Sequence, residues 1–154
     1  MRIAEIELEF GDGQFRFRLP PVFIDQIQKR RGYEVTWPDG SIGRRPKPIG
    51  MIMQEIMSGQ FDALDCLEII KQGLIAGGGG VVAGEDVELN PTKARMMMED
   101  VTATWPLEEV HLFASAILRA CWYGYESAED KKSGNDEPSP TTADCSTSEQ
   151  PQGL

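Results

Sequence analysis

The strongest constraint on the fold is an alternation of apolar and polar residues on both sides of a Gly-Asp-Gly sequence near the N-terminus. Before it, apolar residues occupy every second position of residues 4–10, and glutamates fill the positions between them. After it, residues 14–19 alternate in the same way, with Arg16 and Arg18 on the polar side. Period-two patterning around a short glycine turn predicts a β-hairpin, and the opposite charges on its polar face favour the pairing. Because an isolated hairpin is marginal in water, we expect helices to cover its apolar face.

Most of the remaining chain has helical periodicity. Segments that begin near Phe23, Asp62, Asn90 and Pro106 carry apolar residues at helical spacing, and residues 49–57 could form a further short helix. Asn and Asp are good N-caps, and proline suits the first helical position. The helix from Asp62 must stop at the four glycines of residues 77–80, because glycine is costly inside a helix. The sequence therefore predicts an α+β fold, with an N-terminal β-hairpin packed against a small bundle of about four helices.

The chain is expected to hold one domain, residues 1–126, followed by an acidic tail. Residues 127–154 are rich in Ser, Thr, Pro and carboxylates, and six carboxylates against two lysines give that segment a net charge of −4. Such a segment cannot bury enough apolar surface to offset the entropy of ordering, so we expect residues 127–154 to be a disordered tail.

Residues 33–48 form a basic insertion within the predicted domain. Three prolines and the turn sequence Pro38-Asp39-Gly40 interrupt any apolar period, which predicts an irregular loop. Trp37 is its largest apolar residue, and Arg44 and Arg45 lie close to it in sequence. This set could stack on a nucleic-acid base or hold a partner helix, and Trp37 could equally tuck against its own loop.

No arrangement of residues in the sequence indicates catalysis, a cofactor or a metal. The tetraglycine follows a predicted helix and lacks the Gly-Lys-Ser/Thr sequence of a phosphate-binding loop, so we interpret it as a helix C-cap and a tight path between helices. His111 is the only histidine, which cannot build a Cys/His metal cluster, and no serine lies in a nucleophile elbow. We expect His111 to be a partly exposed residue on the surface or in the seam of a helix. The sequence predicts a binding protein and not an enzyme.

Methionine-rich helical faces are the best candidates for contacts with a partner protein. Methionine side chains repack readily and suit surfaces that accept varied helices, although some of these residues are expected to belong to the core. Together with the aromatic and basic residues of the insertion, the candidate protein-interaction residues are Ile52, Met53, Ile56, Met57, Met96, Met97, Trp37, Arg44 and Arg45.

Three segments in this order resemble one family. They are residues 15–19 (FRFRL), residues 68–79 (EIIKQGLIAGGG), and residues 106–109 (PLEE) leading into 114–120 (ASAILRA). Together they look like the small tail-assembly proteins of gene transfer agents and related siphophage-like particles, over roughly residues 3–125. The basic insertion and the acidic tail depart from that family's pattern.

This resemblance implies a function that composition does not. Proteins of the family are grouped with tail assembly chaperones, which hold the long apolar tape-measure protein until the tail tube forms around it; the expected partners are the tape-measure protein and other tail proteins. The family is also described as a tail-tube component, so a structural protein retained in the particle is the first alternative. A nucleic-acid-associated regulator that uses the basic insertion is the second.

Composition bears on location and on the class of partner. The net charge of −10 argues against a nucleic-acid partner for the surface as a whole. No uncharged apolar run approaches the ~18 residues of a membrane span, and carboxylates near Met1 do not fit a signal peptide. Three widely spaced cysteines suit free thiols. We expect a protein of the bacterial cytoplasm, associated with the particle if it is structural, and self-association remains open.

Overall fold

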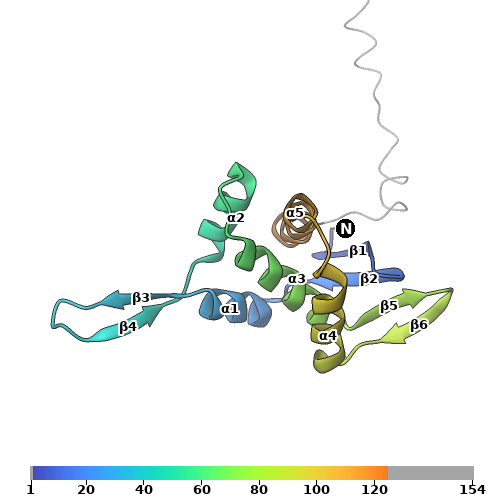
Figure 1. The fold of residues 1–154 in the computed structure, drawn as a ribbon, viewed down its shortest axis with the longest axis horizontal. Coiled ribbons are helices and arrows are strands. Elements are labelled where there is room, and N and C mark those ends of the chain that lie inside the picture. The colour runs from blue at the N-terminus through green and yellow to red at the C-terminus, as the bar shows by residue number, and fades with distance from the viewer. Residues whose placement is uncertain (1, 125–154) are drawn as a thin grey trace, which may run out of the picture. The chain divides into compact units, whose positions relative to one another are not determined.

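A computed structural model describes residues 2–124, and residues 3–124 belong to one folded unit. The predicted acidic tail lies outside the described residues. The fold is α+β, as predicted, and consists of an N-terminal antiparallel hairpin, two further hairpins and five helices (Figure 1). In chain order the elements are β1 (Glu5–Phe10), β2 (Gly13–Arg18), α1 (Pro21–Arg30), β3 (Tyr33–Thr36), β4 (Ile42–Arg45), α2 (Ile49–Ser58), α3 (Ala63–Gly77), β5 (Gly79–Val82), β6 (Glu85–Glu88), α4 (Pro91–Thr102) and α5 (Leu107–Tyr123).

The N-terminal hairpin forms in the register that its alternation predicts. Glu5 lies opposite Arg18 and Glu7 opposite Arg16, so the glutamate row faces the arginines across the strands. Phe15 and Phe17 lie on the other face and are fully buried. Helices α3 and α5 cover this face, as expected, because the hairpin alone could not shield it from water.

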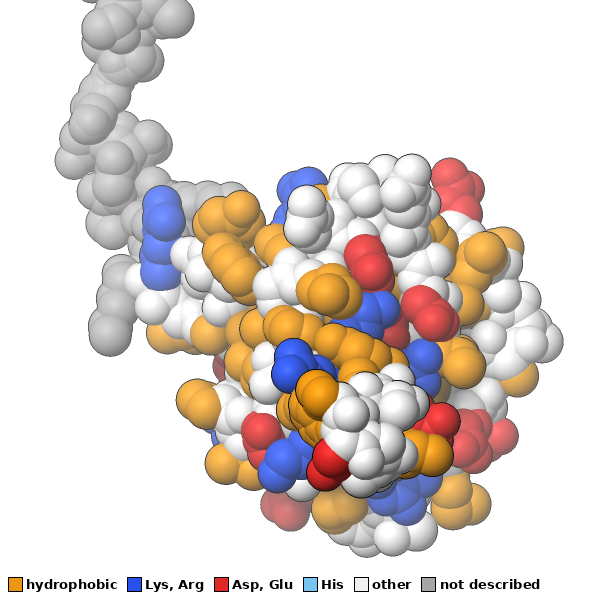
Figure 2. All heavy atoms as spheres, turned by 90° about the vertical axis from the view of Figure 1, so that its left-hand side faces the viewer, with side chains coloured by type: hydrophobic (Ala, Val, Ile, Leu, Met, Phe, Trp, Pro, Cys, Tyr) orange, Lys and Arg blue, Asp and Glu red, His pale blue; other side chains and the backbone are white. Residues whose placement is uncertain are grey.

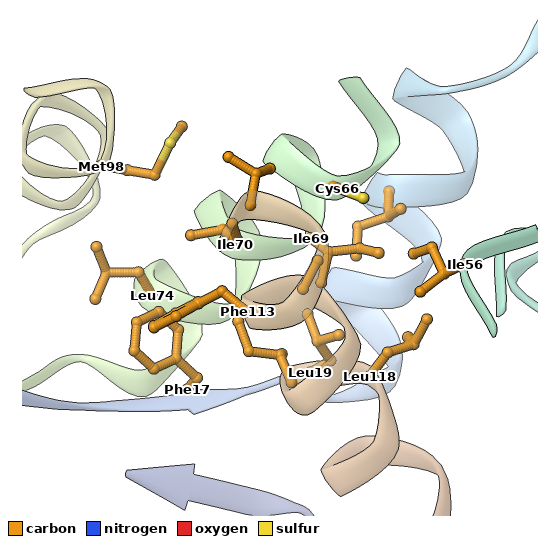
Figure 3. Close-up of a cluster of buried hydrophobic side chains, with 14 of the residues drawn as sticks. Phe17, Leu19, Ile56, Cys66, Ile69, Ile70, Leu74, Met98, Phe113 and Leu118 are labelled. Carbon is orange, nitrogen blue, oxygen red and sulfur yellow. The ribbon is translucent and has the colours of Figure 1, made fainter. Parts of the chain in front are cut away.

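The core lies between the sheet and the helices α3 and α5 (Figure 3). Phe17 meets Phe113 of α5 edge to face at 5.1 Å between ring centroids, and Phe10 meets Phe17 in the same way at 5.5 Å. Leu74 and Ile70 of α3 pack against this aromatic cluster. Edge-to-face contacts of this kind add about 0.5–1.5 kcal/mol to the burial of each ring pair.

The glycine run allows α3 to cross β2 at contact distance. Helix α3 ends at Gly77, and Gly78 is its left-handed C-cap with φ of 77°. A Cβ at Gly77 would collide with the carbonyl oxygen of Arg16, and one at Gly80 with that of Gln14. The guanidinium groups of Arg16 and Arg18 donate to the last carbonyls of the helix, at 3.2 Å from Gly77 O and 2.9 Å from Ala76 O. Cations at this position complement the helix dipole.

The interpretation of the tetraglycine as a path between helices is only half right. Its first half ends α3, but Gly79 and Gly80 begin β5, which pairs with β2 and with β6 to give a four-stranded sheet of order β1-β2-β5-β6. The glycines are required there because neighbouring backbones occupy the space that side chains would take. The bundle also has five helices where about four were predicted.

The prediction of an irregular loop at residues 33–48 is wrong. Strands β3 and β4 form a second antiparallel hairpin, the β3–β4 arm, whose turn is closed by the bond from Trp37 N to Ser41 O at 2.8 Å. Asp39 accepts bonds from the hydroxyl and the backbone N–H of Ser41, and these bonds lower the pKa of Asp39. Strands of four residues are too short to display a period, and the flanking prolines obscured them.

Substitution of Gly77 tests the close crossing of α3 and β2. Gly77→Ala is expected to lower the free energy of unfolding by about 1–3 kcal/mol, because the new methyl group meets backbone that cannot rotate away. Gly50→Ala is the matched control: Gly50 is also helical, nothing lies within 4 Å of its added Cβ, and alanine there should raise stability by up to about 1 kcal/mol. Urea unfolding measures the stability of both variants. Equal unfolding midpoints for Gly77→Ala and Gly50→Ala would contradict the close contact between α3 and β2.

Candidate functional site

The nine interaction candidates lie in three separate places. Those of α2 are split: Ile52, Met53 and Ile56 are buried in the core, and only Met57 is exposed, beside Ser115 of α5. The prediction that the Ile/Met stripe of α2 receives a partner is therefore wrong for these three residues. Their stripe faces the core, where α2 packs on α5 and α1, because it is the only apolar face that the helix has to bury.

Helix α4 keeps part of its methionine face open. Met98 and Ala94 are buried against the core, Met97 is half-buried, and Met96 has 59 % of its side chain exposed. The expected division of these methionines between core and surface is confirmed. The helix begins where predicted: Asn90 is the N-cap, and its side-chain oxygen accepts from Lys93 N at 2.8 Å.

The exposed methionines line a shallow groove of about 520 Å³, the α4 groove. It lies between α4 and the turn that joins β1 to β2, and its residues are Gly11, Asp12, Leu89, Lys93, Met96, Met97, Asp100 and Val101. Gly11 forms the opposite wall with φ of 63°, and a Cβ there would lie 3.2 Å from Val101 and 3.3 Å from Met97. A larger residue would therefore narrow the groove as well as strain the turn.

Charged groups mark the two ends of the α4 groove. Lys93 and Asp100 are seven residues apart on one helix, which separates them by about 10 Å at 1.5 Å per residue. Met96 and Met97 lie between them on α4, and Asp12 of the turn between β1 and β2 adds a second carboxylate on the opposite wall. An apolar floor with a cation at one end and a carboxylate at the other can accept an amphipathic helix in one preferred direction.

Trp37, Arg44 and Arg45 gather on the β3–β4 arm. The indole of Trp37 packs against Gly43, where an added Cβ would lie 2.6 Å from Nε1, and the Arg45 guanidinium stands 5.1 Å from the ring centroid. The local tuck of Trp37 is thus the arrangement found. Arg44 donates to Gly32 O at 2.8 Å. Figure 2 views the molecule from the side on which this arm projects, and basic and hydrophobic side chains lie next to one another there.

A buried carboxylate that the sequence did not reveal holds the base of the arm. Asp65 on α3 has 1 % of its side chain exposed and is bonded by Arg31 at 2.7 Å and by Lys47 at 2.6 Å. Arg31 precedes β3 and Lys47 follows β4, so both ends of the arm are fixed to α3. Burial lowers the pKa of Lys47, but the hydrogen bonds to Asp65 and Glu55 outweigh it and raise the pKa. The bond to Asp65 also raises the pKa of Arg31.

These contacts account for most of the basic charge between residues 29 and 47. Lys29 pairs with Asp25 at 2.9 Å, and Arg30 lies 3.6 Å from Glu68, a further buried carboxylate of α3. With Arg31 and Lys47 also paired, Arg44 and Arg45 are the two basic residues of the segment without an ion pair among residues 2–124. Two exposed arginines provide few cationic contacts for a phosphate backbone, which argues against the nucleic-acid alternative.

His111 is part of a helix seam, as expected. Its ring stacks on Phe61 at 4.2 Å, and Nε2 lies 2.8 Å from the carbonyl oxygen of Ile56 in the last turn of α2. In the described part of the chain, no three His, Cys, Asp or Glu side chains are grouped so as to hold a metal ion. Over residues 2–124, no helix has both the length and the apolarity to cross a bilayer.

Comparison of the chain with protein-family models, with curated proteins and with solved structures finds no match.

Asp65→Asn tests the anchoring of the arm. The substitution leaves Arg31 and Lys47 without a buried counter-charge, so we expect the free energy of unfolding to fall by about 3–5 kcal/mol. Glu55→Gln is the matched control, because Glu55 contacts the same lysine from a side chain that is 34 % exposed, and its loss should cost at most about 1 kcal/mol. Chemical denaturation measures both, and a cost for Asp65→Asn no larger than that of the control would refute the anchoring.

The reactivity of Cys66 provides a second test of the core. Burial, with a smaller effect from the Asp65 and Asp62 charges, raises the pKa of the Cys66 thiol to about 12, and the side chain is fully buried. Since the thiolate is the reactive form, a variant that keeps only this cysteine should resist a thiol reagent at about pH 8 when native and react at once when unfolded. The raised pKa also means that the folded state binds the Cys66 proton more tightly than the unfolded state does. The free energy of unfolding therefore falls as pH rises from 9 towards 12. Rapid native labelling would contradict the structure.

Proposed function

We propose that this chain is a non-enzymatic tail assembly chaperone of a phage-like particle of the gene transfer agent type, and that it binds helical segments of the tape-measure protein in the α4 groove. The observation that carries the proposal is the exposed Met96 and half-buried Met97 in a groove with an apolar floor. A chaperone for a long apolar protein needs an adaptable apolar surface on an otherwise charged body, and methionine provides it.

The spatial arrangement of the resembling segments supports the family assignment. Arg16 and Arg18 belong to the first segment, and they bond the carbonyls of Ala76 and Gly77 in the second. The third segment contributes Ile117, whose side chain lies within 3.3 Å of a Cβ placed on Gly73 in the second. The three segments thus meet at one place in the core.

The charge pattern of the groove defines the expected ligand. A bound helix should carry an apolar stripe with a carboxylate near Lys93 and a basic residue near Asp100, about two turns apart. The retained structural component of the tail tube remains the alternative. It differs in one respect that can be measured: a chaperone is absent from mature particles, whereas a tube component is present in each of them.

Substitution of Met96 tests the groove directly. Met96→Asp should weaken binding of a tape-measure fragment at least about tenfold, because a carboxylate would be desolvated against the partner's apolar stripe. Met51→Asp is the matched control, since Met51 is an exposed methionine on α2 outside the groove, and this variant should bind the fragment as the unchanged protein does. Isothermal titration with purified fragments measures both. Unchanged binding by Met96→Asp would refute the groove, and abundant chain in purified particles would favour the structural alternative.

A further inference from the structure

Two hairpins project from opposite sides of α3, and the last strand of one is basic whereas the last strand of the other is acidic. The β3–β4 arm carries Arg44 and Arg45 on its second strand, while the β5–β6 hairpin carries Glu85, Asp86 and Glu88, all exposed (Figure 1). None of these three carboxylates takes part in an ion pair within residues 2–124. Strands β4 and β6 are therefore complementary in charge, although Glu34 and Asp39 balance the two arginines within the β3–β4 arm as a whole.

Both charged strands are also sheet edges. Within the described residues, β4 pairs with β3 alone, and β6 is the last strand of the order β1-β2-β5-β6 and pairs with β5 alone. Each strand is four residues long, and each leaves one row of backbone N–H and C=O groups without a strand partner. Such an edge accepts a further strand when the side chains permit it.

One register pairs both arginines of β4 with carboxylates of β6. When β4 and β6 are aligned antiparallel along their full length, Ile42 lies opposite Glu88, Gly43 opposite Val87, Arg44 opposite Asp86, and Arg45 opposite Glu85. Directly opposite residues share a face of a sheet, so each arginine meets a carboxylate. Arg44 then lies between Asp86 and Glu34, its partner within the arm.

The competing pairings are less favourable. In the same full-length antiparallel alignment, two copies of β4 would set Arg44 opposite Gly43 and Arg45 opposite Ile42, so neither arginine would meet a carboxylate. Two copies of β6 would set Glu85 opposite Glu88, and like charges directly opposite are destabilising. The edge strand β1 carries its glutamates at every second position, so adjacent arginines cannot both meet one. Among the edge strands of the described residues, only β6 presents adjacent carboxylates, Glu85 and Asp86, to match adjacent arginines.

We propose that the chain self-associates head to tail, with the β4 edge of one copy adding to the β6 edge of the next and Arg44 and Arg45 pairing with Asp86 and Glu85. This inference does not depend on the proposed chaperone function. The contact is heterologous, so it propagates into a ring or a linear chain and does not close as a two-fold dimer. Strands of four residues bury less than the roughly 1,200 Å² of a typical stable interface, so each junction is weak and sensitive to salt.

Sedimentation velocity of the full chain over a concentration series tests the proposal. At low salt the weight-average mass should rise with concentration, and it should fall back towards the monomer as salt is added. Glu85→Lys/Asp86→Lys and Arg44→Glu/Arg45→Glu should each remain monomeric. An equimolar mixture of these two variants should associate again, because each arm then meets an edge of opposite charge.

Two controls separate this contact from general electrostatics and from misfolding. Arg95→Glu/Arg119→Glu changes the net charge by the same amount as the arm variant, at two exposed helical positions away from both strands, and should associate like the unchanged chain. The Glu85→Lys/Asp86→Lys variant changes residues that face Val82 and Val81 across the hairpin, so it breaks no ion pair inside the described fold. A monomeric unchanged chain at low salt, undiminished association of Glu85→Lys/Asp86→Lys, or a mixture that stays monomeric would each overturn the proposal.

Discussion

The pairing of the buried Asp65 carboxylate with Arg31 and Lys47 is the interaction on which the placement of the β3–β4 arm depends. A carboxylate with 1 % exposure would be strongly unfavourable alone, and the two cations offset its loss of solvation. Because these cations stand at the two ends of the arm, its base is fixed to α3 while its strands remain clear of the body. The same pairing occupies Arg31 and Lys47, two basic residues that the sequence had suggested were available to a partner.

The elements that could be predicted from the sequence are those whose signal is local. The first hairpin has alternation over many residues, and its register follows from the positions of Glu5, Glu7, Arg16 and Arg18. Helices α3 and α4 are marked by Asp62 and Asn90 as N-caps. The hairpins at β3–β4 and β5–β6 were missed because their strands are four residues long and because Gly79 and Gly80 have no side chains to produce a pattern. What makes Gly80 a strand residue is its partner Phe15, which is remote in sequence.

The candidate site was predictable to a similar extent. Periodicity indicates which residues share a helix face, but it does not tell whether that face looks inward. Hence Met96 and Met97 were found on an open face, whereas Ile52 and Ile56, with an equally clear stripe, proved to be core. The buried Asp65 could not be found from the sequence, because both cations that pair with it come from other segments. Glu68 pairs with Lys71 of its own helix as well as with Arg30, and this spacing is also typical of an exposed helix face.

The side-chain-free crossing of α3 over β2 also has a consequence for the order of folding. Gly79 and Gly80 bring almost no apolar surface with which to recruit β5, so that strand gains little before its neighbours are in place. The N-terminal hairpin closes a short loop and can form early, whereas joining β5 to β2 closes a long one and must await the docking of α3. Because β6 pairs with β5 alone, the acidic edge joins the four-stranded sheet only together with β5. A nascent chain would acquire that edge only once the core that supports it already exists.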